Sequence, residues 1–297
     1  MLRPILLLSI CLALAAQASG IHAQEAGDPA EPAGQAEPEA QEEAAPAASL
    51  PRAERQEQAL HKQLPGAQLR QLESGDDHFL GLFLAAAQPE PRGGVLLIAD
   101  RNEHADWPEL IAPARRQLSD LGWHTLAITL PDAPLADPTL EGSDRIEMMA
   151  EAAERTIRRI NIAAQALQAE GAKSLVLLGR GEGAFWALHA TAASARPQIE
   201  AAALILAHSR PPALAEGGWE KIDELLAQWQ NPAYEIFAGS GAVTHKRARQ
   251  HELSARRNAN GQYQQLLLPK QDRSELGQRM LVKRLQGWLD KKLPAQP

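Results

Sequence analysis

The chain has 297 residues, a net charge of −7, 4% aromatic residues and a single cysteine, Cys11. One cysteine excludes an intramolecular disulfide framework, and so few aromatic side chains argue against a stacking platform for nucleic-acid bases or sugars.

The chain begins with the pattern of a secretory signal peptide. Arg3 precedes an apolar stretch from Ile5 to Ala16 that is too short to span a bilayer. Small residues allow cleavage after Ala18 or after Ala23, and the change in composition that follows favours Ala23. Either cut removes Cys11, and export without cysteines is typical of a bacterial periplasmic protein. We therefore expect a periplasmic protein with a signal peptide at 1–23 and no transmembrane segment after cleavage.

Residues 24–50 consist mainly of Ala, Glu, Pro and Gln, with seven acidic residues and no basic one. Such a segment cannot bury enough apolar surface to offset the entropy lost on ordering, so we expect a disordered acidic linker. Because this segment carries a charge of −7 and Arg3 carries +1, the rest of the chain carries only −1. The acidity therefore says little about what the folded part binds.

Residues 51–297 have the length of one α/β domain. A helix at 52–63 precedes two strands, 68–73 and 79–84, which flank a turn signal as in a β-hairpin. After the hairpin, continuous apolar runs alternate with segments of helical spacing. The expected strands are 94–99, 124–130, 174–178, 201–207, 233–238 and 263–268, and the expected helices start at Asp106 and Ser143 and then cover 184–195, 219–230, 243–258 and 273–291. This alternation predicts a mostly parallel sheet with helices on both faces and its strand-to-helix loops at one edge.

The most informative motif is Gly179-Arg180-Gly181-Glu182-Gly183, which lies between an apolar strand and a helix rich in small residues. This is the layout of a nucleophile elbow, G-x-S-x-G, in which a sharp turn presents the nucleophile. Together with the element order of residues 66–291, the motif makes the chain resemble the α/β-hydrolase fold. More closely, the chain resembles an uncharacterised family of exported bacterial α/β-hydrolase-like proteins, a domain of unknown function.

The three catalytic positions that this resemblance implies are not kept. The nucleophile position is Gly181, which has no side chain to attack a substrate. The acid position, after the strand at 233–238, reads Ser240-Gly241-Ala242. The histidine position, after the strand at 263–268, reads Pro269-Lys270-Gln271-Asp272. Three departures together argue against the Ser-His-acid mechanism, and we expect a non-catalytic binding or interaction protein.

The alternative is a hydrolase or lyase that recruits Glu182, His208 or Asp272 into a non-standard catalytic set. Glu182 follows the nucleophile position, where the fold needs a backbone N–H for the oxyanion hole. Its carboxylate is either a base or ligand group, or a capping acid that the helix dipole favours. His208 stands beside Ser209, and neighbours in sequence rarely reach the geometry of a working pair.

The loop after the first parallel strand, residues 100–104, is densely polar and should lie at the mouth of the expected pocket. Its Arg101 and His104 either contact an anionic group or belong to an exposed, charged loop. The alternating glycines of the elbow either cradle an anion at a helix N-terminus or permit a sharp turn with close strand–helix packing. The candidate ligand-binding residues are Asp100, Arg101, His104, Gly179, Gly181 and Gly183. The ligand is an unknown small molecule or protein partner.

The sequence contains no metal-ligand spacing, and its glycine-rich turn lacks the full P-loop or dinucleotide pattern. We therefore expect no metal and no cofactor. The helix at 243–258 carries His245 and His251 among several Lys and Arg residues. We interpret this basic helix as a solvated face, and we expect no nucleic-acid partner.

Overall fold

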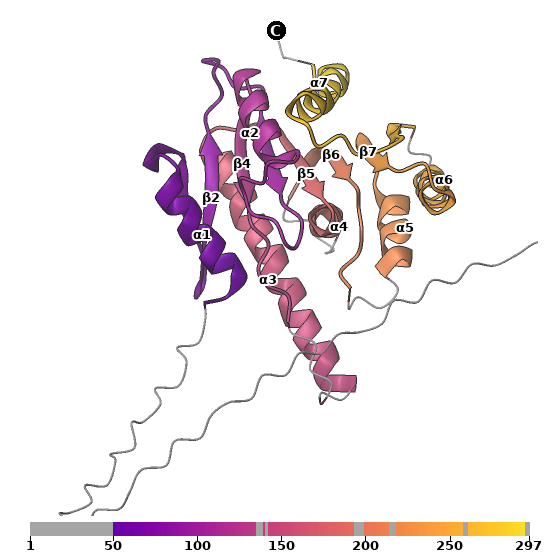
Figure 1. Ribbon diagram of the computed structural model, residues 1–297, viewed down its shortest axis with the longest axis horizontal. Helices are drawn as coiled ribbons and strands as arrows, with labels where there is room; N and C mark the ends of the chain where they lie inside the picture. Colours follow the sequence, from indigo (N-terminus) through magenta and orange to yellow (C-terminus); the bar gives the residue numbers. More distant parts are fainter. Residues whose placement is uncertain are drawn as a thin grey trace, which may run out of the picture. The chain divides into compact units, whose positions relative to one another are not determined.

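An eight-stranded sheet forms the centre of the described part of the chain (Figure 1). The computed structural model describes residues 50–134, 139, 142–192, 199–213, 218–257 and 261–294. All of them fall within the unit that runs from Ser49 to Pro297. The expected signal peptide and residues 24–49 of the expected linker lie outside the described residues.

The sheet has the order β1-β2-β4-β3-β5-β6-β7-β8. Strand β2 runs antiparallel to both of its neighbours, and β4, β3, β5, β6, β7 and β8 are mutually parallel. The strands are β1 (Leu69–Ser74), β2 (Asp77–Leu84), β3 (Gly94–Ile98), β4 (His124–Ile128), β5 (Leu175–Arg180), β6 (Ala201–Ala207), β7 (Ala233–Ala238) and β8 (Tyr263–Leu268). The prediction of a mostly parallel sheet opened by an antiparallel hairpin is confirmed.

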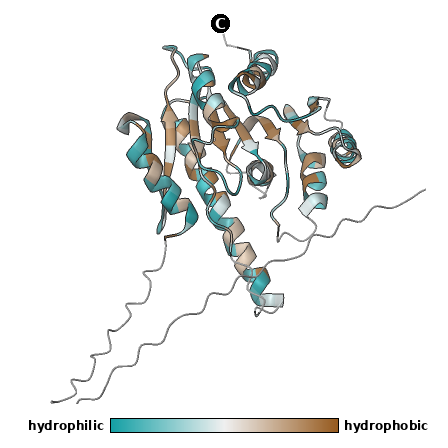
Figure 2. Ribbon diagram, in the orientation of Figure 1, coloured by the Kyte–Doolittle hydropathy of each residue, from teal (hydrophilic) through white to brown (hydrophobic). Residues whose placement is uncertain are grey.

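Helices cover both faces of this sheet. The apolar side chains of α3, α4 and α5 pack on one face, and those of α1, α2 and α7 pack on the other. The helices are α1 (Arg52–Gln63), α2 (Ile111–Asp120), α3 (Gly142–Ala169), α4 (Glu182–Ala192), α5 (Gly218–Gln228), α6 (Ala242–Arg257) and α7 (Glu275–Lys292). Figure 2 shows apolar strands between helices that carry polar residues on their outer sides. Because β3 and β5 are buried along their whole length, their apolar runs 94–98 and 175–178 suit the centre of the sheet.

The two helix starts predicted from capping residues, Asp106 and Ser143, differ in the structure. Helix α2 begins at Ile111 rather than after Asp106. The Asp106 carboxylate instead accepts a hydrogen bond from Nη2 of Arg115 at 2.8 Å, and Arg115 is fully buried. A buried guanidinium needs a charged partner, and this requirement outweighs the capping role. Ser143 lies inside the first turn of α3, where its hydroxyl donates to Asp144.

The strand register places three loops side by side at one edge of the sheet. Ile98 of β3 pairs with Gly179 of β5, and Gly179 pairs with Leu206 of β6. The residue two positions further along each strand therefore reaches the same edge. These residues are Asp100, Gly181 and His208.

Candidate functional site

The elbow keeps the backbone geometry of a sharp strand-to-helix turn. Gly181 has a φ of +57°, a conformation that side chains disfavour and glycine permits. Its amide donates to the carbonyl of Ala207 at 2.9 Å, and its own carbonyl accepts from the amides of Ala184 and Arg210, both at 3.2 Å. The turn is therefore tied both to α4 and to the loop after β6.

The glycines on either side of this turn permit close packing. A Cβ atom on Gly179 would lie 2.3 Å from the carbonyl oxygen of Gly183. A Cβ atom on Gly183 would lie 2.3 Å from the carbonyl oxygen of Ile98. Both contacts are with backbone, which cannot move aside. Packing accounts for these two glycines, and a ligand contact at them stays a prediction.

The carboxylate of Asp100 fills the space beside Gly181 in which a nucleophile would stand. A Cβ atom built on Gly181 would lie 2.1 Å from Cγ of Asp100 and 2.2 Å from its Oδ2. Oδ1 of Asp100 accepts the amide N–H of Glu182 at 2.9 Å and that of Arg101 at 2.8 Å. In the α/β-hydrolase layout, the oxyanion hole uses the amide that follows the nucleophile and one from the loop after β3. The Asp100 carboxylate therefore binds the two amides that stand at these positions in this chain.

Arg210 holds this carboxylate from the solvent side. One terminal nitrogen of Arg210 donates to both oxygens of Asp100, each at 2.9 Å, and the Arg210 side chain is 46% exposed. The preceding residue, Ser209, is buried and its hydroxyl donates to the carboxylate of Glu235. The loop that carries Arg210 is thus anchored in the interior one residue before its contact with Asp100.

Glu235 is the centre of a buried polar cluster. Its carboxylate, on β7, accepts the hydroxyls of Ser209 and Tyr263 and lies 3.0 Å from Nδ1 of His251 on α6. Glu235 and His251 are both 0% exposed. Burial, followed by the negative charge of Glu235, raises the pKa of Tyr263 well above its usual value, so its hydroxyl stays a hydrogen-bond donor.

This cluster contains a serine, an acid and a histidine, but in an order that does not activate the serine as a triad does. In a Ser-His-acid triad the imidazole stands between the hydroxyl and the carboxylate. Here the carboxylate of Glu235 stands between Ser209 and His251, and the whole group is enclosed. The arrangement pairs the Ser209 hydroxyl and Nδ1 of His251 with the Glu235 carboxylate and so fixes the loop, which is a structural role. Nε2 of His251 is buried and has no hydrogen-bond partner among the described residues.

Around the elbow, four carboxylates and four guanidinium groups form pairs with one another. Arg180, which is buried, contacts Glu103 and lies 2.7 Å from Glu109. Arg273 also reaches Glu109, at 3.2 Å. The remaining pairs are Arg210 with Asp100 and Arg101 with Glu182. Because acids and bases balance, this set leaves no net positive charge for an anionic ligand.

Glu182 is buried and faces Arg101 across 3.7 Å. Burial raises the pKa of the Glu182 carboxyl, while the positive charges of Arg101 and Arg210 act in the opposite direction. The negative charge of Asp100 adds to the increase. A carboxyl in this setting holds its proton more readily than usual, which weakens a nucleophilic role.

His208 and His104 have uncharged imidazoles at neutral pH. Burial, followed by the charge of Arg180, lowers the pKa of His208 to about 4. His208 also has a strained backbone, with a φ of +53°. His104 accepts the Asp106 amide at 3.2 Å, and burial lowers its pKa. Neither ring is a cationic contact for an anionic ligand.

Asp272 has a local structural role. Its exposed carboxylate accepts the amide of Ser274 at 3.0 Å and the Ser274 hydroxyl at 2.7 Å, which lowers its pKa. Ser274 is in turn the N-cap of α7, so Asp272 supports the start of that helix. Among the described residues, no hydrogen bond or ion pair joins any two of Glu182, His208 and Asp272. The structure therefore does not assemble them into one catalytic set.

The prediction for His251 is wrong, and the roles of Glu235 and Arg210 are not among the sequence predictions. His251 is fully buried and is not part of the solvated basic face expected for its helix. Glu235 could have been found, because a lone acid inside the apolar strand Ala-Tyr-Glu-Ile-Phe-Ala must find partners when buried. The hydrogen bonds from Arg210 to Asp100 depend on the order and register of the strands, which no pattern within a single segment indicates.

No metal site is evident in the part of the chain that the structure describes, since no three His, Cys, Asp or Glu side chains gather there to hold an ion. Within those residues, no helix combines the length and the apolar character needed to cross a bilayer.

Comparison with known proteins identifies a family and a fold. The chain matches the family described as "Protein of unknown function (DUF3530)" over residues 4–146 and 135–291. No curated protein matches the sequence.

Similar solved structures include an esterase, PF2001, from Pyrococcus furiosus (11% identity, TM-score 0.56, covering 76% of this chain and 92% of that chain). They also include Est1E from Butyrivibrio proteoclasticus (9% identity, TM-score 0.55, covering 76% and 98%). A third is a putative dienelactone hydrolase from Klebsiella pneumoniae (12% identity, TM-score 0.53, covering 75% and 97%). Identities this low establish the α/β-hydrolase-like fold and nothing beyond it.

Proposed function

The chain belongs to the DUF3530 family of proteins of unknown function and has an α/β-hydrolase-like fold, and we propose that it is a non-catalytic binding protein built on that fold. The single observation that supports this role most strongly is the position of the Asp100 carboxylate. It occupies both the space of a nucleophile and the two amides of the oxyanion hole.

Acyl transfer needs a nucleophile, a base and an empty oxyanion hole. Gly181 supplies no nucleophile, and no histidine follows β8 in the sequence. The hole remains, but an ester carbonyl could enter it only by displacing Asp100 from two amides and from Arg210. Hydrogen bonds to charged groups are worth about 1.5–3 kcal/mol each, so the displacement opposes catalysis strongly.

The expected signal peptide also supports a proposal about the compartment in which the protein is located. We propose export to the periplasm and removal of residues 1–23, so that the acidic segment 24–50 forms the N-terminal part of the processed chain. Fractionation of cells that express the full chain tests export. Recovery of the processed protein in the periplasmic fraction is the expected result, and retention of an unprocessed chain in the cytoplasm would contradict it.

A second candidate function is hydrolysis, because the similar structures carry the names of esterases and of a dienelactone hydrolase. For this chain it would require Glu182, His208 or Asp272 to act in place of the usual triad. Glu182 faces Arg101, His208 is a weak base and Asp272 supports the start of α7. These placements favour the binding role.

Ester turnover separates the two functions. The purified protein is mixed with nitrophenyl acetate and nitrophenyl butyrate, and heat-denatured protein at equal concentration serves as the control. We expect no turnover above that control for the wild type, Asp100→Gly, Gly181→Ser or the double variant, because each lacks a base. Saturable turnover by the wild type would overturn the non-catalytic role. Turnover by Asp100→Gly would show that a nucleophile and a base are present once the carboxylate is gone.

A further inference from the structure

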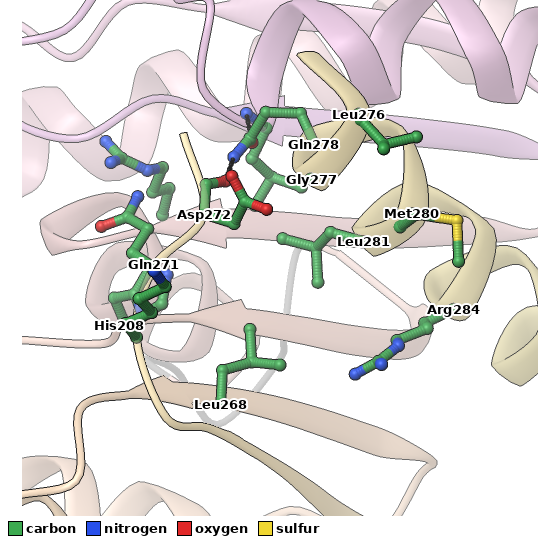
Figure 3. Close-up of a pocket in the computed structure, with 13 residues that line it drawn as sticks. His208, Leu268, Gln271, Asp272, Leu276, Gly277, Gln278, Met280, Leu281 and Arg284 are labelled. Atoms are coloured by element: carbon green, nitrogen blue, oxygen red, sulfur yellow. Dashed lines mark hydrogen bonds between the residues drawn. The ribbon is translucent and has the colours of Figure 1, made fainter. Parts of the chain in front are cut away.

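A separate cavity of about 300 Å³ lies beside the elbow, between the end of β8 and the first turns of α7 (Figure 3). Its wall is largely apolar. The apolar side chains that line it are Leu110, Leu268, Leu276, Met280 and Leu281. In Figure 3, His208 and Gln271 stand at one end, Arg284 stands at the other, and Leu268 and Leu281 lie between them. A cavity whose surface is mostly apolar and which also carries polar groups is the usual form of a small-molecule site.

Two of the apolar side chains that line the cavity are unusually exposed to solvent for large apolar residues. Leu276 is 64% exposed and Met280 is 48% exposed, one turn apart on α7. Covering these two side chains would be favourable, because the free energy falls when apolar surface is removed from water. An apolar ligand in the cavity would cover both of them.

The charges around the cavity favour an anionic head group. Arg180 is neutralised by Glu103 and Glu109, and His208 is uncharged at neutral pH. Arg284 makes no hydrogen bond or ion pair with any described residue, so its guanidinium is available to a ligand. Lys270 also lines the cavity, and the only acid among its described lining residues, Asp272, accepts a hydrogen bond from Ser274. The available charge is therefore positive, and Arg284 provides it at one end of the cavity (Figure 3).

We propose that this cavity binds a medium-chain monocarboxylate, with its alkyl chain between Leu268 and Leu281 and under Met280 and its carboxylate on Arg284. The volume sets the length. At roughly 30 Å³ for each water-sized group, the cavity holds about ten non-hydrogen atoms, which is the size of octanoate. The inference rests on the proposed binding role, for which it names the ligand class.

Calorimetric titration of the chain after signal cleavage tests this inference with sodium octanoate, sodium butanoate, octan-1-ol and methyl octanoate. We expect saturable 1:1 binding of octanoate, about tenfold tighter than octan-1-ol, because only the carboxylate makes charge-assisted hydrogen bonds. Butanoate should bind more weakly than octanoate, because it leaves the apolar wall uncovered.

Three variants check the assignment. Arg284→Gln should abolish the advantage of octanoate over octan-1-ol while leaving octan-1-ol unchanged. Met280→Ser should weaken both ligands. Arg279→Gln is the matched control, because Arg279 lies on the same helix, is 51% exposed, pairs with Glu275 and does not line the cavity. It should change neither ligand.

Absence of saturable octanoate binding, or binding that Arg284→Gln leaves unchanged, would overturn the ligand class and leave the non-catalytic role standing. Release of octanoate from methyl octanoate would instead overturn the non-catalytic role. The two failures are therefore distinguishable in one set of titrations.

Discussion

Adding a single methyl group at the elbow tests whether the Asp100 carboxylate fills the nucleophile space. Gly181 has a φ of +57° and Gly75 has a φ of +64°, so alanine at either position carries a similar backbone strain of about 1 kcal/mol. Nothing lies within 4 Å of a Cβ atom on Gly75, whereas Cγ of Asp100 lies 2.1 Å from one on Gly181. Gly181→Ala must therefore push the carboxylate away from the amides of Glu182 and Arg101. Two amides left without an acceptor cost about 1–2 kcal/mol each.

Urea denaturation followed by tryptophan fluorescence measures the difference. We expect Gly75→Ala to lower the free energy of unfolding by about 1 kcal/mol and Gly181→Ala to lower it by about 3–5 kcal/mol. Adding Asp100→Gly to Gly181→Ala should cost less than the sum of the two single changes, with a coupling of at least about 1 kcal/mol. Equal losses at the two glycines, or additive losses in the double variant, would refute the placement of the carboxylate.

Three further changes test other parts of the structure. Burial, which outweighs the charge of Arg159, raises the pKa of Glu57 from 4.5 to about 7, so the folded state binds the extra proton and its stability falls as pH rises between these values. Glu57→Gln should remove up to about 3 kcal/mol of that decline in stability. If the stability of the wild type and of Glu57→Gln changed with pH in parallel, the raised pKa of Glu57 would be excluded. Glu235→Gln should cost about 3 kcal/mol in urea denaturation, because two buried side chains and the partly buried Tyr263 contact this carboxylate. Glu252→Gln, which breaks only exposed ion pairs, should cost under about 0.5 kcal/mol, and similar losses for the two variants would argue against the buried cluster. In Gly183→Ala the new Cβ atom would lie 2.3 Å from a backbone oxygen, so this variant should not yield folded protein. Gly287→Ala, whose Cβ atom has nothing within 4 Å, should raise the free energy of unfolding by about 0.5–1 kcal/mol. A soluble and stable Gly183→Ala variant would contradict the close packing of this turn.

The fold could be predicted because its signals are local and repeated. The apolar runs 94–98 of β3 and 175–178 of β5 indicate strands buried on both faces, and Gly181 marks a turn that needs positive φ. Local capping signals were less reliable. Asp106 resembles an N-cap in sequence, but its carboxylate accepts a hydrogen bond from the buried Arg115, and the helix starts five residues later.

The candidate site was only partly predictable, because its contacts join residues far apart in the sequence. The sequence patterns indicate Asp100 and Gly181 separately. That the Asp100 carboxylate fills the space beside Gly181 follows only from the pairing of β3 with β5. The role of Arg210 depends on the further pairing of β5 with β6. No periodicity or motif within a single segment carries such information.

Intact-mass spectrometry after exposure to a fluorophosphonate probe tests the central proposal, a hydrolase centre closed by the chain's own carboxylate, most directly. The probe reports an activated serine without requiring knowledge of the substrate. The account predicts no adduct on the unmodified protein under conditions that label a serine esterase completely. A stoichiometric adduct, traced by peptide mapping to Ser209 or Ser240, would show an active nucleophile and contradict the account.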